Sequence, residues 1–183
     1  MKKVSVFVAP GFEEVECLTT VDLLRRAGVE VTLVAVGAEK EITGSNGITI
    51  LADKFFEDMN YDTMDLLVLP GGQPGTNNLK ACEKLIKLVH EFNNAGRKIA
   101  AICAAPTVFG GMGILNGKKA TCYPGCEDGL DGADFQTESV VIDGNITTSR
   151  GIGTAIPFAL NLIEQLEGKE KAEAISKGIV YTV

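Results

Sequence analysis

Short apolar runs bounded by turn residues constrain the fold of this chain most strongly. Residues 4–9 (VSVFVA), 66–69 (LLVL) and 99–102 (IAAI) contain no charged side chain. Such runs are typical of strands that are covered on both faces, as in parallel sheets. The first run is followed by helical periodicity at residues 13–27 and by a second strand pattern at 29–36. Strand, helix and strand in this order predict an α/β fold with a mostly parallel sheet.

The rest of the chain predicts further elements around this sheet. A hairpin is expected at residues 41–51, with Ser45-Asn46-Gly47 as its turn. Helical spacing predicts one buried stripe on the first helix, made of Val15, Leu18, Val21, Leu24 and Ala27. The other expected elements are helices at 82–94, from Pro106, at 154–166 and at 169–177, and strands at 120–123, 139–142 and 146–149. With 183 residues and no linker or repeat, residues 1–183 are expected to form a single domain.

The charge of the chain restricts its partners. The formal net charge is −7, with no long run of either sign. This argues against nucleic acid and against an anionic membrane surface, because both require a basic face. No segment is long enough to span a bilayer, and the apolar run at residues 4–9 is too short for a signal-peptide core. We therefore expect a cytoplasmic protein that binds small molecules or other proteins.

The five cysteines do not form a recognisable framework. Their number is odd and their spacing is scattered, which argues against a set of disulfides. Only one histidine, His90, is present and no C-x-x-C pair occurs, so we expect no metal site. For all but one of the cysteines, a small and partly buried side chain is the favoured interpretation; these four are Cys17, Cys82, Cys122 and Cys126.

Three loops leave strands at the same edge of the predicted sheet. They are residues 10–16, 70–74 and 103–106. In open parallel sheets, ligands bind outside the carboxyl ends of the strands. The topology therefore predicts that Glu16, the amides of Gly71 and Gly72, and Cys103 share a pocket.

Cys103 is the candidate nucleophile of this pocket. Small residues flank it, as the strained turn of a nucleophile elbow requires. The helix that begins at Pro106 places positive partial charge near the sulfur, and the amides of Ala104 and Gly72 are placed to hold an oxyanion. From these residues alone, a buried and inert cysteine remains an equal alternative.

Glu16 is the candidate acid or base. The alternative is an ordinary first-turn glutamate, a role that Glu13 and Glu14 could also fill. His90 lies within the predicted helix at 82–94, away from the strand ends, and a Cys-His dyad in one chain is therefore not expected.

Five motifs in sequence order resemble the ThiJ/PfpI superfamily, and in particular its DJ-one branch. They are GFEEVE (11–16), RRAG (25–28), LPGG (69–72), AAICAAP (100–106) and TSRG (148–151). The resemblance covers nearly the whole chain. It implies a flavodoxin-like three-layer sandwich with a nucleophile elbow, similar to class I glutamine amidotransferases. It further implies a homodimer that needs no cofactor.

The resemblance also implies roles for individual residues. Glu16 would hydrogen-bond Cys103 and lower its pKa, and Gly72 and Ala104 would form an amide pocket. Gly71, Tyr123 and Arg150 would line it. Ala104 stands where peptidase-like members have histidine, and Tyr123 stands where the DJ-one protein has one.

Three functions are compatible with these residues. The first is a cofactor-free glyoxalase or deglycase that acts on reactive carbonyls in stress protection, with Cys103 as nucleophile and Glu16 as acid/base. The second is a redox-responsive chaperone or interaction protein that senses oxidation through Cys103. A peptidase or amidase is the least favoured, because no histidine partner is expected near the thiol.

Overall fold

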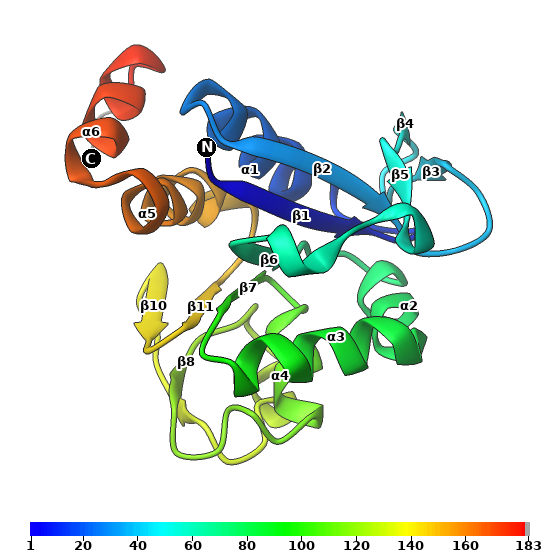
Figure 1. The fold of residues 1–183 in the computed structure, drawn as a ribbon. Helices are drawn as coiled ribbons and strands as arrows, with labels where there is room; N and C mark the ends of the chain where they lie inside the picture. Colours follow the sequence, from blue (N-terminus) through cyan, green and yellow to red (C-terminus); the bar gives the residue numbers. More distant parts are fainter. Residues whose placement is uncertain (182–183) are drawn as a thin grey trace.

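A seven-stranded sheet forms the centre of the computed structural model, which describes residues 1–181 (Figure 1). The strand order is β10-β11-β7-β6-β1-β2-β5, and every neighbouring pair is parallel except β10 and β11. The strands are β1 (Lys3–Val8), β2 (Glu30–Ala35), β5 (Lys54–Phe55), β6 (Leu66–Leu69), β7 (Lys98–Ile102), β10 (Val140–Asp143) and β11 (Ile146–Ser149). The mostly parallel sheet predicted from the apolar runs is confirmed.

Helices cover both faces of this sheet and make a three-layer sandwich (Figure 1). One apolar core lies under α1 (Glu14–Arg26), α5 (Ala155–Glu167) and α6 (Lys169–Gly178). A second core lies under α2 (Gly75–Ala81), α3 (Glu83–Asn94) and α4 (Pro106–Gly111). The central strands are buried on both sides, which explains why their sequences are continuously apolar. Four short 3-10 helices complete the connections: η1 (Phe56–Asp58), η2 (Tyr61–Thr63), η3 (Glu127–Gly129) and η4 (Ile152–Thr154).

Several predicted boundaries differ from the structure. The helix predicted at 82–94 is α3, and a further helix, α2, precedes it, with Cys82 between the two. The strand expected at 120–123 is only β8 (Lys119–Ala120), which pairs with β9 (Asp134–Phe135). Beyond it, the Thr121 amide donates to the side-chain hydroxyl of Thr148 on β11 instead of to a backbone carbonyl of a neighbouring strand. A local apolar pattern cannot show which partner its backbone will find.

The predicted hairpin is confirmed as β3 (Glu41–Thr43) and β4 (Thr49–Leu51), which pair antiparallel. Its tip is held by the buried carboxylate of Glu14 at the start of α1. That carboxylate accepts hydrogen bonds from the Asn46 amide at 2.7 Å, the Asn46 side chain at 3.0 Å and the Ile48 amide at 3.3 Å. The hairpin therefore packs beside the loop that joins β1 to α1.

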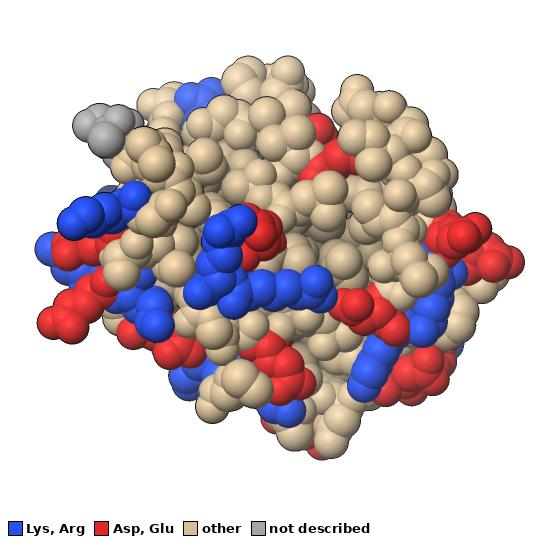
Figure 2. All heavy atoms as spheres, turned by 90° about the horizontal axis from the view of Figure 1, so that it is seen from above, with Lys and Arg blue, Asp and Glu red and all other residues tan. Residues whose placement is uncertain are grey.

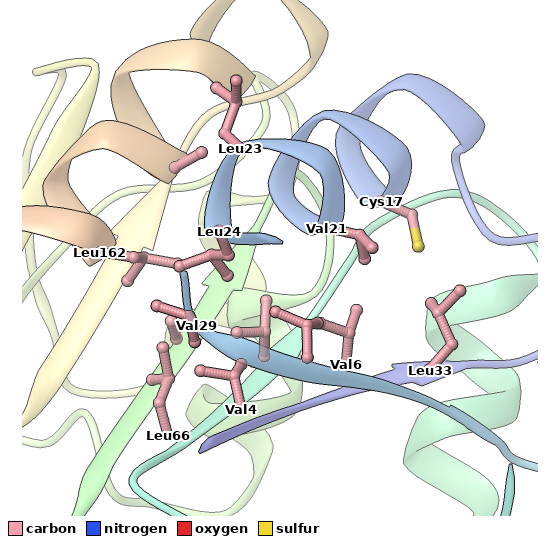
Figure 3. Close-up of a cluster of buried hydrophobic side chains, with 14 of the residues drawn as sticks. Val4, Val6, Cys17, Val21, Leu23, Leu24, Val29, Leu33, Leu66 and Leu162 are labelled. Atoms are coloured by element: carbon pink, nitrogen blue, oxygen red, sulfur yellow. The ribbon is translucent and has the colours of Figure 1, made fainter. Parts of the chain in front are cut away.

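The buried stripe predicted on α1 is partly wrong. Val21 and Leu24 are buried with Cys17 above β1 and β2 (Figure 3). Val15 and Leu18 instead are 46% and 37% exposed. Their face of the helix points away from the sheet, and no element within residues 1–181 covers it. On the side of the molecule that carries α1, α5 and α6, charged side chains gather over one part and leave a broad area almost free of them (Figure 2). In residues 1–181, no helix combines the length and apolarity that crossing a bilayer requires.

Candidate active site

Cys103 occupies a sharp turn between β7 and α4. Its φ is +66°, in the left-handed region that residues other than glycine rarely adopt. The Cys103 amide donates to the carbonyl of Ser149, and its own carbonyl accepts from the Tyr123 amide at 2.8 Å. The side chain is half-buried. This is the geometry of a nucleophile elbow, in which a strained backbone presents one side chain above the strand ends.

Glu16 reaches Cys103 from the first turn of α1. Its carboxyl group forms a hydrogen bond with the Cys103 thiol, and its Oε2 accepts from the Gly71 amide at 3.0 Å. Only 1% of the residue is exposed. The other oxygen, Oε1, has no hydrogen-bond partner within the described residues. One carboxyl oxygen is therefore anchored while the other is free to accept a proton.

Two backbone amides face the sulfur of Cys103. They belong to Gly72 and Ala104, and both donate to Sγ. Gly71 has no room for a side chain, because a Cβ there would lie 2.5 Å from Cys103 Cβ and 2.7 Å from Glu16 Oε2. Glycine at position 71 thus permits the close approach of the three loops.

The electrostatics of the pair are governed by burial. Burial raises the pKa of Glu16 to about 7, and the charge of Glu13 adds to this rise. Burial likewise raises the pKa of Cys103 to about 12, with the negative charge of Glu16 adding and the amides of Gly72 and Ala104 opposing. The lowered thiol pKa that the resemblance implies requires a protonated Glu16, because an ionised Glu16 places a second negative charge beside the sulfur and raises the pKa of the thiol. Between these two pKa values the pair holds one proton, which belongs to both groups.

Two further residues, Tyr123 and Arg150, are predicted to line the pocket. Tyr123 is half exposed, and its ring packs at Gly151, next to Glu16 Oε1. Arg150 directs its guanidinium to the carbonyl of Thr137 at 2.9 Å. Among the described residues, no hydrogen bond joins that guanidinium to Cys103 or Glu16, and the predicted lining role of Arg150 stays a prediction.

Comparison with known proteins places this arrangement in a family. The model of the DJ-1/PfpI family matches residues 2–165. The chain belongs to the DJ-1/PfpI family. The fold and the sequence resemblance are thereby confirmed.

Individual members of the DJ-1/PfpI family are similar to this chain over nearly its whole length. Protein DJ-1 homolog B of Arabidopsis thaliana is 45% identical over 181 residues, which are 98% of this chain and 41% of that protein. The chain thus spans less than half of that relative's length. Glutathione-independent glyoxalase DJR-1.2 of Caenorhabditis elegans is 35% identical over 167 residues, which are 90% of this chain and 88% of that protein. The structure of oxidized Toxoplasma gondii DJ-1 superimposes with a TM-score of 0.96 at 36% identity, covering 100% of both chains.

The other thiols of this DJ-1/PfpI chain lie in different surroundings. All five cysteines are free. Cys17 and Cys122 are fully buried, and burial raises the pKa of Cys122 to about 12. Cys82 and Cys126 are half-buried and pack against the apolar core under α2, α3 and α4, whereas Cys103 packs against the core on the other face of the sheet. His90 lies on α3 and lines a groove with residues of α2 and α3.

Glu13 is a further residue of this DJ-1/PfpI site. The sequence predicts it only as an alternative first-turn glutamate, yet it is the N-cap of α1 and contacts both Glu16 and Gly71. The acidic triplet in residues 13–16 was the only available signal. It does not say which carboxylate turns toward the sheet.

Proposed function

We propose that this protein converts small α-oxoaldehydes such as methylglyoxal into hydroxy acids without a cofactor, as a protective activity in the cytoplasm. The observation that carries the proposal is the hydrogen bond between the Cys103 thiol and the Glu16 carboxyl, whose pKa lies near 7. A nucleophile beside an acid/base with a pKa near the working pH is what this reaction requires. A relative named as a glutathione-independent glyoxalase supports the same chemistry.

The reaction begins with addition of the thiolate. With the proton of the pair on Glu16, the Cys103 Sγ forms a bond to the aldehyde carbon and the carbonyl electron pair moves to oxygen. That oxygen takes the proton from Glu16 to give a hemithioacetal, and Glu16 is left ionised. The amides of Gly72 and Ala104, which donate to Sγ in the free protein, stabilise the negative charge as it moves from sulfur to oxygen.

Glu16 then moves a proton between neighbouring carbons. It removes the proton from the former aldehyde carbon, and a proton returns to the adjacent carbon, so that a thioester of the hydroxy acid results. The free Oε1 is the atom suited to this transfer, since Oε2 is held by the Gly71 amide. Water finally attacks the thioester, the C–S bond breaks, and the thiol is restored. One carbon is oxidised and its neighbour reduced, so the net change is addition of one water.

The proposal predicts lactate as the product from methylglyoxal. Purified protein should form lactate from methylglyoxal without glutathione, measured enzymatically or by NMR. Brief reaction followed by acid quenching and peptide mass spectrometry should locate the adduct on Cys103. Absence of lactate, or adducts spread evenly over the five cysteines, would contradict the proposal.

We further propose that a second copy of the chain covers the outer face of α1. Val15 and Leu18 are exposed there, and Ile48, whose amide binds Glu14, adds a side chain that is 54% exposed. These exposed apolar side chains lie on α1 and on the hairpin that Glu14 holds against the first turn of α1.

Disruption of this surface should yield a monomer. Leu18→Glu places a charge in the contact and is expected to convert a dimer to a monomer in size-exclusion chromatography with light scattering. Ile142→Glu serves as the control, because Ile142 is also exposed but lies on the edge strand β10. A wild-type monomer, or equal masses for wild type and Leu18→Glu, would reject the dimer.

A further inference from the structure

We propose that Glu13 is a positioning residue that holds both Glu16 and the Gly72 amide against the sulfur of Cys103. The inference deepens the proposed function and rests on it for its kinetic readout. It is carried by two contacts of Glu13, one from the side chain and one from the backbone.

The side-chain contact fixes the helix turn that carries Glu16. Glu13 is the N-cap of α1, and its Oε2 accepts from the Glu16 amide at 2.7 Å. Glutamate is not among the residues preferred at this position, where shorter side chains reach the amide more easily. Here the residue is only 7% exposed, so the carboxyl group has been brought largely out of water to make the contact. The residue whose amide it binds is the residue that supplies the acid/base.

The backbone contact fixes the peptide group that faces the thiol. The Glu13 amide donates to the Gly71 carbonyl at 2.8 Å. That carbonyl and the Gly72 N–H belong to the same planar peptide group, so fixing the oxygen also fixes the direction of the N–H. The Gly72 N–H donates to Cys103 Sγ. A Cβ on Gly72 would lie 2.4 Å from the Glu13 nitrogen, which shows how closely the two loops meet.

Together with a third hydrogen bond, these two contacts link Glu13, Glu16 and Gly71 to one another beside the Cys103 thiol. Glu13 binds the Glu16 amide and the Gly71 carbonyl, while the Gly71 amide binds Glu16 Oε2 at 3.0 Å. Loss of the cap would loosen the helix turn and the glycine peptide together. Because acid/base and amide donor share this anchor, Glu13 influences both without touching the substrate.

Glu13 also contributes charge to the site. Its carboxylate adds to the rise in the pKa of Glu16, after burial. The other titratable groups around Glu16 are Cys103 from the elbow, Cys17 from α1 and Tyr123 across Gly151. Removing the charge of Glu13 should therefore make ionisation of the Cys103–Glu16 pair easier, whichever group releases the proton.

Two substitutions separate positioning from charge. Glu13→Gln keeps an oxygen that can accept from the Glu16 amide but removes the charge, whereas Glu13→Ala removes both. Glu170→Gln is the matched control, because Glu170 is an exposed first-turn glutamate of α6. Alkylation of Cys103 by iodoacetamide, followed across pH by peptide mass spectrometry, reports the ionisation of the pair and needs no turnover.

Glu13→Gln should shift the midpoint of Cys103 alkylation down by about one pH unit while keeping kcat for lactate formation within about threefold. Glu13→Ala should show the same shift and lose about tenfold in kcat, because the acid/base and the amide are no longer held in place. Glu170→Gln should match the wild type. A Glu13→Gln midpoint equal to that of Glu170→Gln, or a Glu13→Ala enzyme with unchanged kcat, would overturn the proposal. If the wild type forms no lactate, the proposed function fails, while the alkylation midpoints still decide the role of Glu13.

Discussion

Cys103→Ala is expected to lower the rate of lactate formation from methylglyoxal by about three orders of magnitude or more. Removal of a covalent nucleophile eliminates the step that forms the intermediate, and the other groups of the site do not replace it. The fold should persist, because alanine is smaller than cysteine and meets the same backbone strain at φ +66°. The measurement is the steady-state rate, together with thermal unfolding to confirm that the variant is folded.

Cys82→Ala is the matched control for this substitution. Cys82 is also a half-buried free thiol, but it lies between α2 and α3 and packs against the other apolar core. It should retain wild-type activity. A Cys103→Ala protein that is folded and still produces lactate at the wild-type rate would refute the assignment of the nucleophile.

Glu16→Gln is expected to have opposite effects on activity and stability. Activity should fall by about 100-fold or more, because the amide cannot accept and return the proton. The increase of activity with pH through about 7, which the pKa of Glu16 predicts for the wild type, should also disappear. The free energy of unfolding at pH 8, in contrast, should rise by about 3 kcal/mol.

The sign of the stability change follows from the direction of the pKa shift. Burial raises the pKa of Glu16 in the folded protein from 4.5 to about 7. The folded state therefore retains this proton over a pH range in which the unfolded state has lost it, and stability falls as the pH rises through that range. Glutamine mimics the protonated form, so its advantage is absent at pH 4 and complete above pH 7. Urea unfolding of both proteins at pH 4 and pH 8 measures the difference, and equal unfolding free energies at pH 8 would contradict the raised pKa.

The sequence patterns were most informative where a residue's role follows from chain order alone. The three loops at 10–16, 70–74 and 103–106 could be placed at one edge because they follow strands of a parallel sheet. The structure joins them through the Glu13–Gly71, Gly71–Glu16 and Gly72–Cys103 hydrogen bonds. Apolar periodicity was less informative on α1. Val15 and Leu18 match the pattern of a buried stripe, but both side chains lie on the exposed face of this helix.

By itself, the sequence determined the parallel sheet and the edge at which the loops meet, and it favoured a tight turn at Cys103, because buried strands and tight turns leave local signatures. Only the tertiary structure decided among the three glutamates at the start of α1. Glu14 turns to the hairpin, Glu13 caps the helix and Glu16 faces the thiol. It also decided the protonation of the pair, because the pKa of a carboxyl group depends on how much water the surrounding chain excludes. Burial and neighbouring charge arise from contacts between distant segments, and a linear pattern does not contain them.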